Sequence, residues 1–312
     1  MSAPQLSVIV PAYNEEMGLA ETHRRLTGVL SGMDVDYEII YIDDGSRDRT
    51  LEIVESLRAS DDHVRLLSLA RNHGHQIAVT AGLDAAEGDA VVIIDADLQD
   101  PPEVIPRMYE RFLEGYDVVY GKRSGREGDS AFKKGTAFAF YRLLNALTDV
   151  EIPADTGDFR LVSRRAADAV RGMREHDRYL RGMFAWIGFK QTPVEFDRDK
   201  RFAGETHYPL RRMLKLAIDG VMSFSVKPLG AIAALGAIMA GAGLLWLIIL
   251  LTLLLAGSKG LGLSAIAAMM LECSGLILTA LGIVGGYVGR VYQEVQNRPL
   301  YRLARREGFN DR

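Results

Sequence analysis

The sequence has a single cysteine, Cys273, which lies in an apolar run of the 312-residue chain. One cysteine excludes an intramolecular disulfide framework and argues against a cysteine-based metal site. The glycine-rich phosphate loops G-x-G-x-x-G and G-x-x-x-x-G-K-[ST] are also missing, so neither a dinucleotide-dependent enzyme nor a P-loop NTPase is supported. If the protein holds phosphate, it does so with another kind of site.

Strong charge of either sign is missing too. The formal net charge of -4 is too close to neutral for a general nucleic-acid binder, so no nucleic-acid partner is expected. The first ten residues, "MSAPQLSVIV", have no basic region ahead of a long apolar stretch and do not read as a cleaved signal peptide. The N-terminal part is therefore expected to stay in the cytoplasm.

Charged residues are almost absent from two long stretches near the C-terminus. Residues 229–256 contain none, and residues 261–289 contain only Glu272. Each stretch exceeds the roughly 20 residues that a helix needs to cross a bilayer, which predicts two transmembrane helices rather than a very apolar soluble hairpin. Basic residues flank the pair, whereas the link at 257–260 carries one lysine. The sequence thus predicts a multi-pass plasma-membrane protein with its N-terminal domain and both termini in the cytoplasm.

Apolar, β-branched runs alternate with helical patterns in the N-terminal part of the chain. The runs predict strands at 6–10, 37–42, 64–69, 90–95 and 117–121, with helices between them at 15–31, 47–59, 76–87 and 102–114. This alternation predicts an α/β fold with a mostly parallel sheet and helices on both faces.

Polar stretches follow four of the predicted strands. They are "PAYNEE" after the first, "DDGS" after the second, "DADLQD" after the fourth and "GKRSGR" after the fifth. Parallel sheets bind ligands beyond the carboxyl ends of their strands, so these stretches are the candidate site.

The fourth strand runs directly into two carboxylates. Side chains two apart on an extended segment point the same way, so Asp95 and Asp97 face one ligand and Gln99 shares their direction. Two carboxylates and a neutral carbonyl suit Mg²⁺ or Mn²⁺, which completes its coordination with water and substrate phosphates. A metal-bound diphosphate is the expected substrate group. Asp100, which precedes Pro101, fits a helix cap and is left out of the metal site.

The turns after the first two strands offer acceptors for a nucleotide. The carboxylate of Asp43 suits base N–H and ribose hydroxyl donors, whereas turn chemistry is the better interpretation of Asp44. Tyr13 is suited to stack on a base and Glu15 to accept a hydrogen bond from it, although Glu15 also suits the first turn of a helix.

Five stretches carry a family resemblance: "SVIVPAYNEE", "YIDDGSRDRT", "DADLQDPPE", "DTGDFRL" and "RFAGETHYPL". With the two predicted membrane helices behind them, they resemble family 2 glycosyltransferases that act on polyprenyl phosphates. The resemblance covers nearly the whole chain and is strongest to bactoprenol glucosyltransferases and dolichyl-phosphate mannose synthases. It implies a GT-A catalytic domain, Mg²⁺ or Mn²⁺ as cofactor and inversion at the anomeric carbon.

The resemblance also implies roles for individual residues. The residues expected to contact the nucleotide are Pro11, Tyr13, Glu15, Asp43 and Asp95. Those expected to contact the metal and the diphosphate are Asp95, Asp97 and Gln99. Those expected to contact a phosphate or the acceptor are Arg123, Arg181, Arg201 and His207. Asp158 matches the proposed catalytic base of the family, but it is expected to orient the acceptor or the sugar as much as to take a proton. Asp155 is the competing candidate. Asp97 supplies charge stabilisation in catalysis, and Arg201 clamps phosphate unless it is a solvated surface arginine. His207 stands where the family often has lysine, and a neutral imidazole contributes less charge.

The expected reaction moves one sugar from a nucleotide sugar, with UDP-glucose favoured, to a polyprenyl phosphate at the membrane. A processive polysaccharide synthase is disfavoured because the Q-x-x-R-W element is missing and two spans form no obvious export channel. A catalytically silent membrane protein that binds nucleotide sugar or translocates lipid is disfavoured by Asp95, Asp97 and Asp158.

Amphipathic patterns predict how the chain meets the bilayer. Residues 207–224 predict a basic helix at the membrane surface, and residues 130–148 show a similar pattern that also suits packing on the catalytic domain. Glycines in the apolar stretches permit close helix contacts, and relatives form tetramers, so a homo-oligomer is expected. The predicted domains are a GT-A catalytic domain at 1–205, an interfacial helix at 206–227, a transmembrane hairpin at 228–290 and a cytoplasmic tail at 291–312.

Overall fold

The computed structural model describes residues 4–123, 156–197, 227–255 and 263–309. They fall into two compact units. The first takes its described residues from Met1–Arg142, Val150–Met213 and Pro299–Arg312, and the second takes most of its own from Leu214–Arg298.

The first unit is built on an eight-stranded sheet with the order β7-β5-β6-β4-β1-β2-β3-β8. The strands are β1 (Leu6–Ala12), β2 (Tyr37–Asp43), β3 (Val64–Leu69), β4 (Ala90–Ile93), β5 (Val118–Arg123), β6 (Thr156–Ser163), β7 (Gln191–Phe196) and β8 (Leu303–Glu307). The central strands β4, β1, β2 and β3 are all parallel, and β5 is parallel to β7. Strand β6 runs antiparallel between β4 and β5, and β8 runs antiparallel to β3. The predicted α/β fold with a mostly parallel sheet is confirmed.

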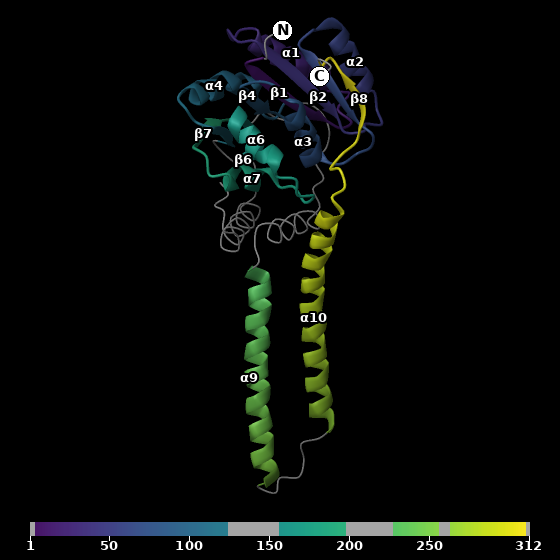
Figure 1. The fold of residues 1–312 in the computed structure, drawn as a ribbon, viewed down its shortest axis with the longest axis vertical. Coiled ribbons are helices and arrows are strands. Elements are labelled where there is room, and N and C mark those ends of the chain that lie inside the picture. The colour runs from purple at the N-terminus through teal and green to yellow at the C-terminus, as the bar shows by residue number, and fades with distance from the viewer. Residues whose placement is uncertain (1–3, 124–155, 198–226, 256–262, 310–312) are drawn as a thin grey trace. The chain divides into compact units, whose positions relative to one another are not determined.

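Helices cover both faces of this sheet (Figure 1). They are α1 (Leu19–Leu30), α2 (Thr50–Ser60), α3 (His75–Ala85), the 3-10 helix η1 (Pro102–Val104), α4 (Ile105–Leu113), α6 (Arg164–Gly172) and α7 (Leu180–Trp186). Helices α1, α2 and α4 share one hydrophobic cluster on one face, and α3 packs on β1 and β2 from the other, next to α6.

Side-chain alternation along β1 divides the core between the two faces. Val8 and Val10 belong to the cluster with α1, α2 and α4. Ile9 points the opposite way, toward Gly82 of α3, where an added Cβ would lie 2.5 Å from the Cγ2 atom of Ile9. Gly82 therefore lets α3 pack tightly against the sheet.

The strand register brings four loops together at one edge of the sheet. Ala12 pairs with Asp43, Asp43 pairs with Ser68, and Ile9 pairs with Ile93. Strands β1, β2, β3 and β4 thus end side by side, and the loops that follow them meet at the carboxyl edge where a ligand site is expected.

Two expectations about local structure are wrong. The cap residue of η1 is Pro101 and no side chain caps this helix, so Asp100 does not act as a cap; it is buried instead. The predicted tail at 291–312 is not a separate segment, because α10 (Leu263–Gln296) extends into it and β8 then joins the sheet of the catalytic unit.

The second unit contains two long helices, α9 (Lys227–Leu255) and α10, that contact each other. In the described part of the chain, one stretch, Glu272–Gln296 of α10, is long and apolar enough to cross a membrane by length and composition. The predicted pair of spanning helices is therefore not confirmed as a pair, and for α9 it stays a prediction. The predicted amphipathic helices at 130–148 and 207–224 lie outside the described residues.

Candidate active site

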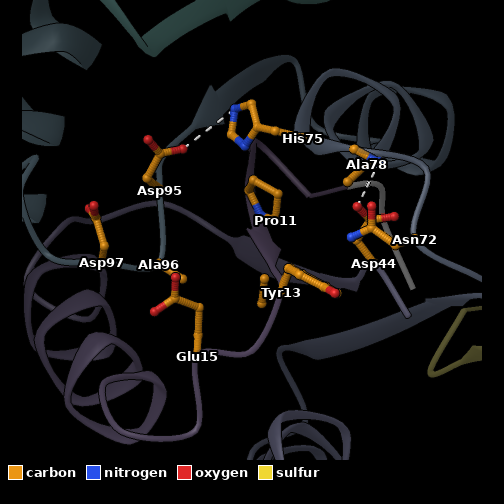
Figure 2. Close-up of a pocket in the computed structure, with 12 residues that line it drawn as sticks. Pro11, Tyr13, Glu15, Asp44, Asn72, His75, Ala78, Asp95, Ala96 and Asp97 are labelled. Carbon is orange, nitrogen blue, oxygen red and sulfur yellow. Dashed lines mark hydrogen bonds and ion pairs between the residues drawn. The ribbon is translucent and has the colours of Figure 1, made fainter. Parts of the chain in front are cut away.

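A pocket of about 460 Å³ opens at the carboxyl edge of the sheet (Figure 2). Five residues singled out from the sequence line it: Pro11, Tyr13, Glu15, Asp95 and Asp97. The loop after β3 and the start of α3 add lining residues that the sequence did not single out: Asn72, Gly74, His75 and Ala78. Figure 2 shows Asp95 and Asp97 at one end of the pocket and Asp44 with Asn72 at the other.

Backbone hydrogen bonds to side chains join the loops after β1 and β2. The Asn14 amide N–H donates to the Ser46 hydroxyl at 3.1 Å, and the Arg47 N–H donates to Oδ1 of Asn14 at 2.9 Å. The Glu15 N–H donates to the Thr50 hydroxyl at 2.8 Å. These bonds fix the backbone that presents Tyr13 to the pocket, where the Tyr13 ring remains 41% exposed and free to contact a flat ligand.

The two aspartates after β2 have different environments. Asp43 is buried, and its carboxylate accepts hydrogen bonds from the Ser46 N–H and the Ser68 hydroxyl, both at 3.0 Å. Asp43 does not line the pocket, whereas Asp44 does. The Asp44 carboxylate accepts the N–H groups of His73 at 2.7 Å and Gly74 at 2.8 Å. Burial raises the pKa of Asp44, and the two N–H groups oppose that rise.

The loop that carries Asp95 and Asp97 is anchored through its backbone. The Ile94 N–H donates to the Ile9 carbonyl at 3.1 Å, and the buried Thr22 hydroxyl donates to the Ala96 carbonyl at 2.7 Å. The Gln99 N–H donates to Oδ1 of Asp97 at 3.1 Å. Gln99 thus supports Asp97 through its backbone, and its side chain is not among the pocket-lining groups.

Asp158 on β6 lies among several donors. Arg181 of α7 donates to both carboxylate oxygens, from Nε at 2.8 Å and from Nη2 at 3.2 Å. Gln76 donates from Nε2 at 3.3 Å, and Nε2 of His75 lies 3.4 Å from Oδ2. Burial would raise the pKa of Asp158, but Arg181 and His75 outweigh it and hold that pKa well below its ordinary value. Asp158 is therefore a carboxylate anion at neutral pH.

Arg160 stabilises the backbone at Asp158. Its guanidinium is buried, donates to the backbone carbonyls of Asp158 at 3.3 Å and Gly157 at 3.1 Å, and lies 4.8 Å from the centre of the Phe184 ring. Burial lowers the pKa of Arg160 to about 10, so the group remains charged at neutral pH. The buried cation adds to the positive charge around Asp158.

His75 lies between the carboxylates of Asp95 and Asp158. Its Nε2 atom is 3.6 Å from Oδ1 of Asp95 as well as 3.4 Å from Asp158. Burial opposes charge on the imidazole, but Asp158 and Asp95 outweigh it and raise the pKa of His75 to about 9. The imidazole is therefore protonated at neutral pH and carries positive charge to the end of the pocket where Asp95 lies.

Asp95 has an ion pair with His75 but an incomplete set of hydrogen bonds. Its Oδ1 atom is buried and has no hydrogen-bond partner. Burial raises the pKa of Asp95, and the nearby charges of Asp158 and Asp97 raise it further against the effect of His75. Among the described residues, no group of three or more His, Cys, Asp or Glu side chains is placed to hold a metal. Asp95 and Asp97 therefore fit a hard cation only if phosphate and water supply most of its ligands.

Arg123, at the end of β5, lies close to Gly157 and Asp100. A Cβ added at Gly157 would be 3.3 Å from Nη2 of Arg123 and 3.9 Å from Oδ2 of Asp100, so the glycine leaves room for both side chains. Asp155, Arg201 and His207, which the sequence also assigns to the site, lie outside the described residues.

The residues missed from the sequence come from the loop after β3. The rule that polar residues at strand ends form the site applies to "RNHGH" at 71–75 as it does to the other four stretches. That rule would have found Asn72 and His75. No spacing in the sequence indicates that Gln76 reaches Asp158, because the two are 82 positions apart.

The sequence matches glycosyl transferase family 2 over residues 7–171. The uncharacterized glycosyltransferase YkcC of Bacillus subtilis is 47% identical over 309 residues, which cover 99% of this chain and 96% of that protein. The prophage bactoprenol glucosyl transferase homolog of Escherichia coli is 36% identical over 304 residues, 96% of this chain and 99% of that protein.

The bactoprenol glucosyl transferase of Shigella phage SfX is 36% identical over 306 residues, which cover 97% of this chain and 100% of that protein. Solved structures are less similar. Glucosyl-3-phosphoglycerate synthase from Mycobacterium tuberculosis, in complex with Mn²⁺, UDP-glucose and phosphoglyceric acid, has a TM-score of 0.47 and 24% identity, covering 70% of this chain and 78% of that one.

Proposed function

Because this chain belongs to glycosyl transferase family 2, we propose that it transfers glucose from UDP-glucose to a polyprenyl phosphate at the cytoplasmic face of the membrane. Relatives that match nearly its whole length are named bactoprenol glucosyl transferases, which supports both the sugar and the lipid acceptor. The observation that carries the proposal is the pocket, in which two acidic residues follow a parallel strand and His75 contacts both Asp95 and the ionised Asp158.

The nucleotide is proposed to bind along the loops after β1, β2 and β3. Tyr13 provides an exposed ring for the base, and Glu15 and Asp44 provide acceptors for its N–H groups and for ribose hydroxyls. Asp43, which the resemblance assigns to the nucleoside, is proposed to act through Ser46 and Ser68 by holding the turn that presents Asp44.

Asp95 and Asp97 are the residues proposed to hold Mg²⁺ or Mn²⁺ together with the donor diphosphate. Two oxygen ligands from the chain match the coordination of these ions when phosphates complete it. Such an ion would stabilise the negative charge that develops on the leaving nucleotide. The buried Oδ1 atom of Asp95, which has no hydrogen-bond partner and only the ion pair with His75, supports this assignment.

The acceptor needs little help from a strong base. The second pKa of a phosphate monoester is about 6, so a lipid phosphate is largely dianionic at pH 7 and attacks the anomeric carbon directly. Asp158 has a pKa well below its ordinary value, which makes it a weak base. We therefore assign to Asp158 the orientation of the sugar or the acceptor. Arg123 and Arg181 are proposed to attract the acceptor phosphate, with Arg201 and His207 as further phosphate contacts.

The second unit is proposed to anchor the enzyme as a hairpin of two spanning helices. The Glu272–Gln296 stretch of α10 supports one crossing, and the charge-free stretch at 229–256 supports the other. An acceptor held by its lipid tail diffuses in the plane of the same membrane, so anchoring raises the encounter rate with the enzyme. A homo-oligomer is proposed from the glycines of these helices.

The proposal is tested with the full-length chain in nanodiscs, labelled UDP-glucose, undecaprenyl phosphate and Mn²⁺. We expect an acid-labile product that extracts into chloroform, and a panel of nucleotide sugars should give the highest kcat/KM for UDP-glucose. A polymer would indicate a processive synthase, and no product with any donor would contradict the proposal.

Metal removal gives the first prediction. EDTA should abolish product formation, and Mn²⁺ or Mg²⁺ should restore it. Asp97→Asn should lower kcat by about 100-fold or more, because a neutral amide binds a hard cation poorly and leaves the departing phosphate without its counter-charge. Asp62→Asn makes the same change at an exposed aspartate outside the pocket and should leave kcat unaltered. Full activity of Asp97→Asn in the presence of EDTA would exclude the metal site.

A further inference from the structure

The N-terminus of α3 places two consecutive side chains between the two carboxylate groups of the site. His75 is the first residue of the helix and Gln76 the second. Nε2 of His75 lies 3.6 Å from Asp95, in the loop after β4, and 3.4 Å from Asp158 on β6. One imidazole nitrogen therefore bridges the loop after β4 and strand β6.

Gln76 uses both ends of its amide. Nε2 donates to Oδ2 of Asp158 at 3.3 Å, and Oε1 accepts the backbone N–H of Leu180 at 2.9 Å. Leu180 is the first residue of α7, the helix that carries Arg181. Gln76 thus connects Asp158 to the same helix whose arginine binds Asp158, so the carboxylate and its cation are held in one arrangement.

One property of His75 and one of Asp95 indicate that His75 acts on Asp158. The imidazole Nε2 carries one hydrogen, which it can donate to one carboxylate at a time. Asp95 is the residue assigned to the cation and has its own Oδ1 atom without a hydrogen-bond partner. If Asp95 were to hold a cation, the N–H of His75 would be available to Asp158.

We propose that His75 is a positioning residue of the transfer reaction: it orients the Asp158 carboxylate relative to Asp95, and Gln76 ties Asp158 to α7. The inference rests on the proposed function, because it assigns a task in that reaction. It goes beyond the pocket description by predicting that loss of the Nε2 donor lowers the rate of transfer and not the affinity for the donor nucleotide.

The test compares His75→Gln with His75→Asn in the full-length enzyme. The amide nitrogen of glutamine takes the place of Nε2 of histidine, whereas that of asparagine is one methylene shorter and cannot reach Asp158. We expect kcat to fall by about 3-fold or less for His75→Gln and by about 10- to 100-fold for His75→Asn, with KM for UDP-glucose within about 3-fold in both. Direct binding of UDP with Mn²⁺, measured by calorimetry, should stay within about 3-fold of the wild-type value.

A double-mutant cycle with Asp158→Asn examines whether His75 acts through Asp158. If it does, His75→Asn should reduce kcat by about 3-fold or less in the Asp158→Asn background, because the group that it positions is already lost. Thermal unfolding of each variant verifies that the fold is retained.

Three results would overturn the inference while leaving the proposed function intact. They are equal losses for His75→Gln and His75→Asn, multiplicative losses in the cycle, or a raised KM at unchanged kcat, which would make His75 a donor-binding residue. A wild-type enzyme that forms no glucosylated lipid would instead overturn the proposed function and the inference with it.

Discussion

Gly45 is a residue at which the backbone leaves no room for a side chain. It lies in the turn after β2 with a φ of +67°, and an added Cβ would be 2.6 Å from the carbonyl carbon of Arg71 and 2.7 Å from the amide nitrogen of Asn72. We predict that Gly45→Ala lowers the free energy of unfolding by about 2 kcal/mol or more, because strain at positive φ adds to a backbone clash. The change would also displace the loop that carries Asn72 and Gly74, so nucleotide affinity should fall.

Gly28→Ala is the matched control for Gly45→Ala. Gly28 lies inside α1, and an added Cβ meets nothing within 4 Å. Alanine is favoured over glycine in a helix, so Gly28→Ala should raise the free energy of unfolding by about 0.5 to 1 kcal/mol. Chemical denaturation of both variants measures the two values, and a Gly45→Ala variant as stable as the wild type would contradict the close approach.

Single residues also show where prediction from the sequence stops. Asp95 and Asp97 were predictable because they directly follow the buried strand β4, and ligands bind beyond the carboxyl ends of parallel strands. Asp44 was assigned to turn chemistry, but its carboxylate accepts the N–H groups of His73 and Gly74, 29 and 30 positions away, and lines the pocket; no sequence pattern shows either contact. His75 meets Asp158 only because β4, β6 and α3 pack together, and this contact depends on the order of the strands.

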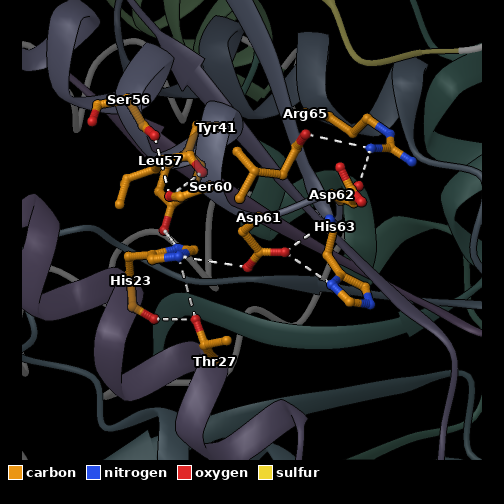
Figure 3. A network of polar contacts seen from close by, with 11 residues as sticks. His23, Thr27, Tyr41, Ser56, Leu57, Ser60, Asp61, Asp62, His63 and Arg65 are labelled. Atoms are coloured by element: carbon orange, nitrogen blue, oxygen red, sulfur yellow. Dashed lines mark hydrogen bonds and ion pairs between the residues drawn. The ribbon is translucent and has the colours of Figure 1, made fainter.

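A polar network joins α1, β2 and the loop between α2 and β3 (Figure 3). Nδ1 of His23 on α1 lies 3.2 Å from the hydroxyl of the buried Tyr41 on β2, and Nε2 lies 3.6 Å from Asp61, which follows α2. Asp61 also contacts Nδ1 of His63, the residue before β3, at 2.9 Å. The Thr27 hydroxyl lies 3.5 Å from Nε2 of His23.

This network predicts a stability that depends on pH. Burial lowers the pKa of His23, and Asp61 only partly opposes that effect. The unfolded chain, in which the pKa of His23 is about 6.5, therefore binds a proton more readily than the folded chain. The contribution of neutral His23 is present above about pH 6.5 and is lost as the pH falls through the lowered pKa.

His23→Gln should flatten the fall of the melting temperature between about pH 7 and pH 5, because the variant has no proton to bind at this position. Thr27→Val removes a neighbour that does not titrate, so it should change the melting temperature by a similar amount at each pH. An unaltered pH slope in His23→Gln would show that His23 does not set it.

The elements of the sheet differ in how well the sequence predicts them. The strands β1 to β5 and the helices between them lie within a few residues of the predicted ranges, because apolar runs in buried parallel strands are continuous. Strand β8 has the sequence "LARRE" with four exposed residues, and its strand conformation comes from pairing with β3. A strand that is stabilised by a partner far away in the sequence gives no periodic signal of its own.

At the scale of the whole molecule, β8 ties the end of the chain to its N-terminal half. Leu300 is buried beside this strand, the Tyr301 hydroxyl donates to Asp84 at 2.9 Å, and the Ala70 N–H donates to the Arg302 carbonyl at 2.9 Å. We predict that Leu300→Ala lowers the free energy of unfolding of the catalytic unit by about 2 to 3 kcal/mol, because it leaves a cavity in a packed site.

Leu303→Ala makes the same substitution on β8 itself, at a side chain that is 39% exposed. Since little buried area is lost there, the cost should be below about 1 kcal/mol. Denaturant titration of both variants gives the comparison. Equal costs at the two positions would mean that the strand is not docked through Leu300.

The position of β8 also restricts the membrane topology. Strands β1 and β8 belong to one sheet, so the chain before α9 and the chain after α10 lie on the same side of any membrane that it crosses. The number of crossings between them must therefore be even, and one crossing by α10 requires a second one. Single-cysteine variants distinguish two crossings from none, and the only native cysteine, Cys273, is replaced by serine to prepare them.

In that background, Ser258→Cys places a thiol in the sequence between α9 and α10, and Ser60→Cys places one at the end of α2 in the catalytic unit. With intact spheroplasts and a membrane-impermeant maleimide, we expect labelling of Ser258→Cys at once and of Ser60→Cys only after permeabilisation, because basic flanks favour the cytoplasmic side for both outer ends. The opposite labelling pattern would reverse the orientation. Protection of both thiols until permeabilisation would mean that the helices do not cross, and the even number of crossings would then be zero.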